Sequence, residues 1–102
     1  MSLVHEILVG HFDLKTFSRR APACVRPLVT ERIARLLASA DLSPDDEALR
    51  RGDYLVFRWT GSQATLDLMR QIAEAEDCYA IEMNNLEIVH HPRGAPGSWP
   101  TH

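Results

Sequence analysis

The sequence predicts one α/β domain of the α+β kind: a four-stranded mixed sheet with a βαβ unit and a C-terminal hairpin, and two main helices packed mainly on one face. Three observations predict it. Short β-branched stretches read as strands, two longer stretches carry apolar residues at helical spacing, and the two kinds alternate along the chain. At 102 residues the chain can build one hydrophobic core but not two. The domain is expected at residues 1–91, followed by a Pro- and Gly-rich irregular tail at 92–102.

The first strand is expected at Leu3–Phe12 (LVHEILVGHF). Both of its faces are mostly apolar, which is typical of a strand that is covered on both sides or central in its sheet. Asp13 follows it and can cap a short helical turn over Leu14–Ser18. Residues 19–27 contain two prolines, so this segment is expected to be irregular.

Two helices are predicted from apolar positions at helical spacing. The first spans Leu28–Ala40, with Pro27 suited to its first turn. The second spans Gln63 to about Glu76, with Ser62 as its N-cap. A short additional helix is expected over residues 43–50, because a serine, a proline and three acids form a typical helix start there.

The remaining strands follow from β-rich stretches. Tyr54–Thr60 (YLVFRWT), the helix after it and Tyr79–Met83 make up the expected βαβ unit, with a right-handed crossover to a parallel neighbour. Tyr79–Met83 and Leu86–His90 are expected to form a hairpin around Asn84-Asn85, because asparagine tolerates the positive φ that a two-residue turn requires.

That hairpin places Glu82 directly opposite Glu87. Cross-strand carboxylates repel each other unless water or a cation lies between them. Arg58 lies on the polar side of its own strand and is the expected internal partner. Two interpretations are open: a solvated sheet face on which Arg58 bridges the glutamates, or an acidic patch that binds a basic partner or a metal.

Charge is segregated along the chain. Between residues 15 and 35 six basic residues stand against one acid, and between residues 41 and 91 eleven acids stand against four arginines. Two interpretations are open: the charges cluster by chance and pair with neighbours in the fold, or the dipolar distribution steers an oppositely charged partner or a second copy of the chain. Nucleic acid is an unexpected partner, because the net charge is −3 and the basic stretch carries only Phe17 as a stacking side chain.

We expect no cofactor, no metal site and no catalytic set. His5 and His11 lie about 20 Å apart along one strand, and His90 and His91 point to opposite faces. A zinc site needs three or four ligands in one place. Cys24 precedes a helix and neighbours a basic residue, which lowers a thiol pKa, but no histidine stands beside it to act as a base.

The composition is that of a globular protein, 45% hydrophobic and 25% charged. No apolar run approaches the roughly 18 residues of a membrane span, and the N-terminus lacks the pattern of a signal peptide. Two cysteines without a CxxC pair favour free thiols in a reducing compartment, so we expect a cytoplasmic protein.

Trp99 lies among prolines and glycines in the tail. A tryptophan in water exposes a large apolar surface, so Trp99 is expected to dock on its own domain, on a second copy or on a partner. The last strand of the hairpin is expected to be a sheet edge, which the tail or another chain must cover. Dimerisation through that edge is one expectation.

The run Tyr54–Met83 (YLVFRWTGSQATLDLMRQIAEAEDCYAIEM) resembles the last strand–helix–strand of barstar-type ribonuclease inhibitors. The shared features are an aliphatic strand with a tryptophan, a helix, and a cysteine before the closing strand. The resemblance covers under a third of the chain. The tyrosine, glycine, asparagine and aspartate of that family's binding helix have no counterpart, and the hairpin at Asn84-Asn85 is extra. The resemblance is one of layout and implies no site residues.

These observations support three functional hypotheses. The first is a small protein-binding module of the immunity, inhibitor or regulatory type, whose partner is another protein or a second copy. Its candidate contact residues are Arg58, Glu82, Glu87 and Trp99. The second is a small enzyme or ligand-binding subunit that recognises an anionic metabolite between the sheet and residues 13–27, with the anion held by Arg19, Arg26 or Arg58. The third is a structural subunit of a larger assembly.

Overall fold

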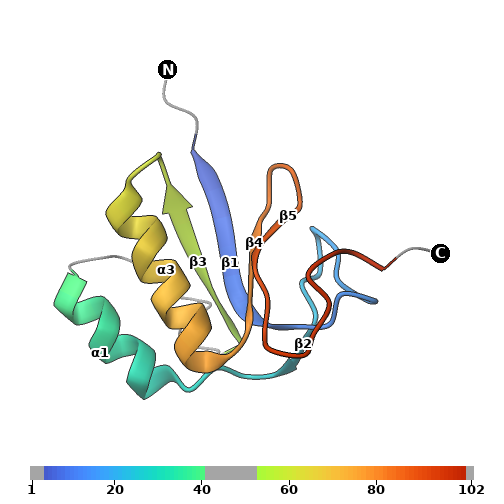
Figure 1. Cartoon of the computed structure of the whole chain (residues 1–102), viewed down its shortest axis with the longest axis horizontal. Coiled ribbons are helices and arrows are strands. Elements are labelled where there is room, and N and C mark those ends of the chain that lie inside the picture. Colours follow the sequence, from blue (N-terminus) through green and yellow to red (C-terminus); the bar gives the residue numbers. More distant parts are fainter. Residues whose placement is uncertain (1–3, 41–52, 101–102) are drawn as a thin grey trace.

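The structure, a computed structural model, describes residues 4–40 and 53–100. Within these ranges the chain forms an antiparallel sheet of five strands and two helices, an α+β arrangement. The strands are β1 (His5–Phe12), β2 (Cys24–Arg26), β3 (Tyr54–Trp59), β4 (Tyr79–Glu82) and β5 (Glu87–His90). The helices are α1 (Thr30–Ala40) and α3 (Gln63–Glu76). Both helices lie on one side of the sheet, and the segment after β1 and the tail lie on the other (Figure 1). No helix of the described ranges is long and apolar enough to cross a membrane.

β1 is the centre of the sheet, as its two apolar faces predict. It pairs with β3 along one side and with β4 along the other, and its residues from Ile7 to Phe12 are all buried. The close approach of β3 requires the glycine in this strand. A Cβ on Gly10 would lie 2.9 Å from the Cβ of Tyr54, a separation that real side chains do not tolerate.

The predicted mixed sheet of four strands is not confirmed, nor is its βαβ unit. β3 and β4 run in the same direction, but β1 lies between them, so every pairing among the described strands is antiparallel. The physical reason is burial: the strand that is apolar on both faces takes the central position and separates the two strands that α3 connects.

The fifth strand, β2, falls in the segment for which irregular structure is predicted. It pairs with the end of β1, with Phe12 opposite Cys24 and His11 opposite Arg26, and the register shifts between these two pairs. The prolines flank this three-residue strand instead of interrupting it, so they remove no hydrogen bond from its ladder.

The predicted limits of α3 are confirmed. The hydroxyl of Ser62 accepts a hydrogen bond from the amide of Thr65, and Asp77 closes the helix in the left-handed region at φ 52°. α1 begins at Thr30, two positions after the predicted Leu28. The short helix predicted over residues 43–50 lies outside the described residues.

The hairpin turns through four residues, Met83–Leu86, and not through the two predicted asparagines. Glu82 does lie opposite Glu87, but a bulge then places Ala80 opposite His90. The left-handed residue of the loop is Leu86, at φ 52°. The loop is longer than predicted because the backbone amides of Asn84 and Asn85 turn inward and donate to the carboxylate of Glu82.

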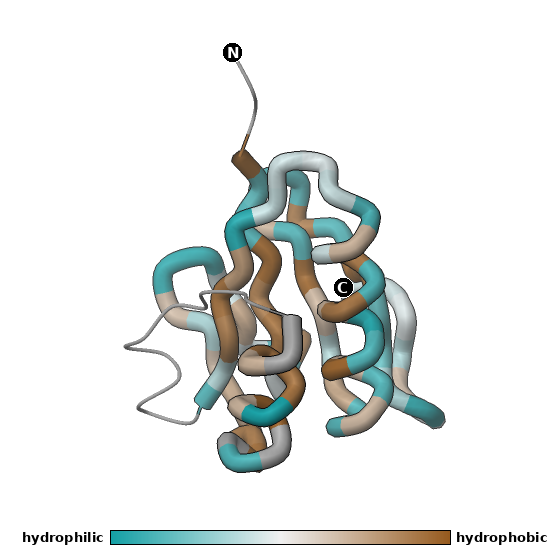
Figure 2. Tube along the Cα trace, turned by 90° about the vertical axis from the view of Figure 1, so that its left-hand side faces the viewer, coloured by the Kyte–Doolittle hydropathy of each residue, from teal (hydrophilic) through white to brown (hydrophobic). Residues whose placement is uncertain are grey.

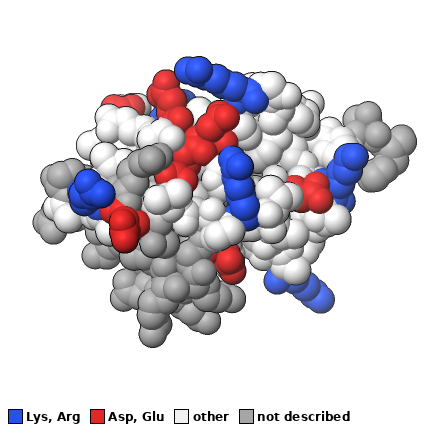
Figure 3. All heavy atoms as spheres, turned by 90° about the horizontal axis from the view of Figure 1, so that it is seen from below, with Lys and Arg blue, Asp and Glu red and all other residues white. Residues whose placement is uncertain are grey.

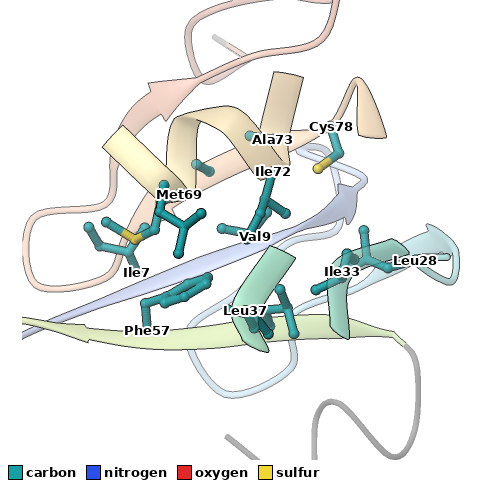
Figure 4. Packing of buried hydrophobic residues seen from close by; sticks show 13 residues of the cluster. Ile7, Val9, Leu28, Ile33, Leu37, Phe57, Met69, Ile72, Ala73 and Cys78 are labelled. Carbon is teal, nitrogen blue, oxygen red and sulfur yellow. The ribbon is translucent and has the colours of Figure 1, made fainter. Parts of the chain in front are cut away.

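Apolar side chains pack on both faces of the sheet, so the molecule has two cores. On the helix-covered face, strand residues such as Val9 and Phe57 meet Ile72 of α3 and Leu37 of α1 (Figure 4). The opposite surface, here called the tail-covered face, is covered by residues 13–24 and by the tail. Figure 2 shows the hydrophobic stretches concentrated in the central strands and on the inner sides of the elements that cover them.

Candidate functional site

Trp99 docks on its own domain. Its indole Nε1 donates a hydrogen bond to the carbonyl of Leu86 at 2.6 Å, and its ring centroid lies 5.4 Å from that of Phe17. The tail thus binds the end of the hairpin and the segment that follows β1. The carbonyl it satisfies belongs to the loop residue just before β5, the strand that was expected to be a sheet edge.

Two further hydrogen bonds hold the tail. The hydroxyl of Tyr79 donates to the carbonyl of Pro96 at 2.9 Å, and the amide of Arg93 donates to the Oδ1 of Asp77 at 2.9 Å. Because the tail has no regular secondary structure, these contacts and Trp99 determine its path across the sheet.

The segment after β1 is organised by Asp13, which caps a turn as predicted. Its carboxylate accepts hydrogen bonds from the amide of Lys15 at 3.1 Å and the hydroxyl of Thr16 at 3.2 Å. Its backbone carbonyl accepts from the amide of Phe17 at 2.9 Å. The carboxylate of Asp13 is therefore engaged locally.

An apolar pocket of about 340 Å³ opens between this segment and the tail. The sheet, the segment after β1 and the tail all contribute to its lining, which consists of Phe12, Asp13, Leu14, Lys15, Val25, Tyr79, Ala95, Pro96 and Pro100. It lies between the sheet and residues 13–27, where the ligand-binding hypothesis expects a pocket. Its lining differs from that hypothesis, because none of Arg19, Arg26 and Arg58 belongs to it.

The segments beside the pocket carry exposed apolar and basic side chains, of which Val25 and Lys15 belong to its lining. Val25 is 70% exposed, and the side chains of Lys15, Arg19, Arg20 and Arg26 are all exposed. Among the described residues, none of these four cations has a carboxylate within ion-pair distance. Arg19 donates instead to the neutral carbonyl of Asn84 at 3.0 Å.

Exposed acids lie on other elements. On α3, at its C-terminal end and on β5, they are Asp67, Glu74, Asp77 and Glu87, and α1 carries Glu31. Glu6 of β1 is also exposed and lies opposite Arg58 on the tail-covered face. Seen from below, acidic side chains gather near the middle of the surface and Lys and Arg side chains are spread around them (Figure 3). On this face basic and acidic side chains therefore adjoin one another.

Arg58 does not lie between the two glutamates. It is opposite Glu6 of β1 and alternates with Phe57, so it lies on the tail-covered face. Glu82 lies opposite Ile7, and Glu87 lies opposite Glu82, so both glutamates are on the helix-covered face. Arg58 therefore does not bridge the two glutamates. The side chains of Arg58 and Glu87 are both exposed.

Glu82 is only 5% exposed and anchors the hairpin loop. Its carboxylate accepts hydrogen bonds from the amides of Asn84 at 2.8 Å and Asn85 at 2.9 Å, and one oxygen lies 3.0 Å from Nδ1 of His5. Burial alone would raise the pKa of Glu82, but the hydrogen bonds from His5 and the two amides outweigh burial and lower it. Glu82 is therefore ionised at neutral pH and satisfied within the chain.

His11 is buried at the other end of β1, with its Nε2 3.8 Å from a carboxylate oxygen of Glu76. Burial lowers the pKa of His11, and the nearby Arg26 lowers it further, against the opposing effect of Glu76. At neutral pH His11 is therefore largely uncharged, and its contact with Glu76 is polar packing and not a full ion pair.

Neither cysteine is activated. Burial and the charge of Asp53 raise the pKa of the Cys24 thiol to about 11, and burial raises that of Cys78 to about 12. Of the two interpretations of Cys24, an activated thiol and a buried unreactive one, the raised pKa agrees with the second, because the thiol packs inward and donates to the carbonyl of Asp53. In the described part of the chain, no group of three or more His, Cys, Asp or Glu side chains is placed to hold a metal.

Comparison of the chain with family models, with curated proteins and with solved structures finds no match. The pocket residues that sequence reasoning missed are Leu14, Lys15, Val25 and Ala95. One feature of the sequence could have indicated them: two irregular segments contain isolated apolar residues that follow neither helical nor strand spacing.

Proposed function

We propose that this chain is a small protein-binding module that acts by surface complementarity and uses the pocket of the tail-covered face as its anchor point. The observation that carries the proposal is an open apolar pocket of about 340 Å³ beside the 70% exposed side chain of Val25. Protein interfaces concentrate their binding energy where an apolar side chain of one partner fills a pocket of the other.

The surrounding groups favour binding over catalysis. The carboxylate of Asp13 is held by hydrogen bonds within its own turn, and the thiol of Cys24 is protonated at neutral pH. Lys15 is an exposed cation at the rim, suited to charge recognition. The described residues that line this pocket include no Ser, Thr, Cys or His, so its lining offers shape and charge for recognition.

Site-specific photocrosslinking in the producing cells tests the proposal. Val25 is replaced by p-benzoyl-phenylalanine, and Gln71 on the exposed side of α3 is replaced in a control protein. We expect one discrete adduct from position 25 and none from position 71. A second variant, Ala95→Phe, places a large side chain in the pocket and should remove that adduct. The same adducts from both positions, or an adduct that Ala95→Phe leaves unchanged, would contradict the proposal.

The second candidate is a ligand-binding subunit, favoured by the volume of the same pocket, since small-molecule sites typically occupy roughly 300–1,000 Å³. The cation in its lining is Lys15 and not one of the arginines named by the anion hypothesis. An apolar carboxylate would suit it better than a phosphorylated metabolite. Thermal unfolding with a series of straight-chain carboxylates distinguishes the two: stabilisation that Ala95→Phe removes would favour the small ligand.

A structural subunit and a homodimer are the remaining proposals. The edge strand β5 and the exposed Glu87 and Arg58 are the surfaces on which they depend. A native mass spectrum of the untagged chain tests both, because it reports the subunit count and any retained ligand together.

A further inference from the structure

We propose, on the basis of the proposed function, that the segment seated at this pocket is an acidic, extended peptide with one apolar anchor residue. The anchor side chain enters the pocket, and carboxylates on either side of it face the exposed basic side chains of the two segments that cover this face. The partner is thereby defined by chemistry: a stretch of Asp or Glu interrupted by a leucine-like residue.

The two segments that cover this face are strongly basic in a chain that is acidic overall. Residues 13–26 and 92–100 together carry five basic side chains and one acidic side chain, whereas the whole chain has a net charge of −3. All five cations are exposed: Lys15, Arg19, Arg20, Arg26 and Arg93. A local positive surface of this kind attracts and orients an acidic partner.

Among the described residues, none of these five cations has a carboxylate within ion-pair distance. The one acid of these two segments, Asp13, lines the pocket, and its carboxylate accepts hydrogen bonds from the amide of Lys15 and the hydroxyl of Thr16. These hydrogen bonds leave its charge in place, so five basic groups and one acidic group give the two segments a formal net charge of +4. Arg19 is bound to a neutral carbonyl. Among the described residues the contacts between basic and acidic groups are those of His5 with Glu82 and of His11 with Glu76, and neither includes one of these five cations. Arg26 lies opposite His11 at the end of β1.

The pocket adds the apolar requirement. Its walls include Leu14, Ala95 and Pro96, with the ring of Phe12 behind them. Lys15 is in its lining, which places a positive charge beside an apolar side chain that enters. A nucleic acid fits this surface less well, because the nearby aromatic ring of Phe17 is already in contact with Trp99 and unavailable for base stacking.

Titration of the ¹⁵N-labelled full chain with synthetic peptides tests this inference. The probe is a seven-residue peptide with a central leucine flanked by three glutamates on each side. We expect saturable shifts of the backbone amide signals of Leu14, Lys15, Val25 and Ala95. Added salt should weaken the binding, since exposed charges are screened.

Matched peptides separate the two requirements. Alanine in place of the central leucine should weaken binding about tenfold, because the buried apolar area of the anchor is lost. Lysines in place of the glutamates should abolish the saturable shifts. The double variant Lys15→Glu/Arg20→Glu should weaken the glutamate peptide at least about threefold, whereas Arg70→Glu on the exposed side of α3 should leave it unchanged.

Each contrary outcome has a distinct meaning. Equal or tighter binding of the lysine peptide at the pocket signals would overturn the acidic preference and leave the protein-binding function intact. Stronger shifts with a thymidine oligonucleotide, or shifts of the same signals on dilution of the protein alone, would overturn it in favour of a nucleic acid or a second copy. Absence of shifts with every peptide would also overturn it, and the adduct at position 25 would then decide the protein-binding function separately.

Discussion

The two faces of the sheet are covered in different ways. On the helix-covered face, α1 and α3 place aliphatic residues such as Ile33 and Ile72 against the strands, and these side chains are fully buried. On the tail-covered face, two irregular segments contribute Phe17 and Trp99, which stay partly exposed, and a pocket opens between the segments. The helix-covered face is thus tightly packed, whereas the tail-covered face is covered through a few individual contacts.

The difference follows from how each cover is built. A helix repeats its apolar positions at regular spacing, so that its side chains interdigitate with the sheet along its whole length. An irregular segment rich in proline and glycine has no such period, and it is fixed by individual contacts such as those of Trp99 and Tyr79. We therefore expect stability to depend mainly on the first face, and binding to use the second.

The largest effect should come from the helix-covered core. Ile72→Ala removes a fully buried side chain between α3 and the strands and should lower the free energy of unfolding by about 2–5 kcal/mol. Gln71→Ala, next to it on the exposed side of the same helix, should change that free energy by no more than about 0.5 kcal/mol. Urea denaturation of both variants measures the difference, and a loss below about 1 kcal/mol for Ile72→Ala would contradict the assignment.

Removing the main anchor of the tail should cost less. Trp99→Ala loses one hydrogen bond and one ring contact, together about 1.5–3 kcal/mol. Trp99→Phe keeps the ring and should lose about 1 kcal/mol, because only the bond to Leu86 is missing. The helical signal in circular dichroism should persist in both variants. Loss of that signal in Trp99→Ala would contradict the expectation that the helix-covered face stays folded when the tail is released.

The contribution of Glu82 to the free energy of unfolding should depend on pH. The pKa of Glu82 is lower in the folded chain than in the unfolded chain, so its contribution is complete above the unfolded value of about 4.3 and is lost as the pH falls through the folded value. Glu82→Gln removes this contribution at all pH values. The difference in unfolding free energy between the two proteins should therefore be constant near neutrality and shrink below about pH 4. A difference that grows on acidification would contradict the lowered pKa.

The smallest change in stability is expected at the pocket. Ala95→Phe fills open space at the surface and should alter the free energy of unfolding by less than about 1 kcal/mol. The thermal midpoint of the variant, compared with that of the unaltered chain, measures this. A loss comparable to that of Ile72→Ala would show that the region around Ala95 is already tightly packed and offers no room for a partner.

Features encoded locally were predictable from the sequence. Both ends of α3 follow from Ser62 as its cap and from the spacing of its apolar residues, and the central place of β1 follows from its two apolar faces. The four-residue loop was missed because the capture of two backbone amides by Glu82 is a contact that propensities do not encode. β2 was missed because three residues between prolines carry no period.

The candidate site was the least predictable part. Its lining joins Leu14 and Lys15 to Ala95 and Pro96, residues about eighty positions apart that meet only when the tail folds back over the sheet. The ligand-binding hypothesis places a pocket between the sheet and residues 13–27, with an arginine to hold an anion. The arginines chosen to line it were wrong, since no sequence pattern shows which side of an irregular segment faces inward.

The most direct test compares stability and binding in the same two variants. Ile72→Val trims the helix-covered core, and Ala95→Phe fills the pocket of the tail-covered face. For each, the free energy of unfolding and the yield of the photocrosslinked adduct at position 25 are measured together. We expect Ile72→Val to lose about 0.5–1.5 kcal/mol and to keep the adduct, whereas Ala95→Phe keeps its stability and loses the adduct. An adduct yield that follows stability in both variants would contradict this expectation.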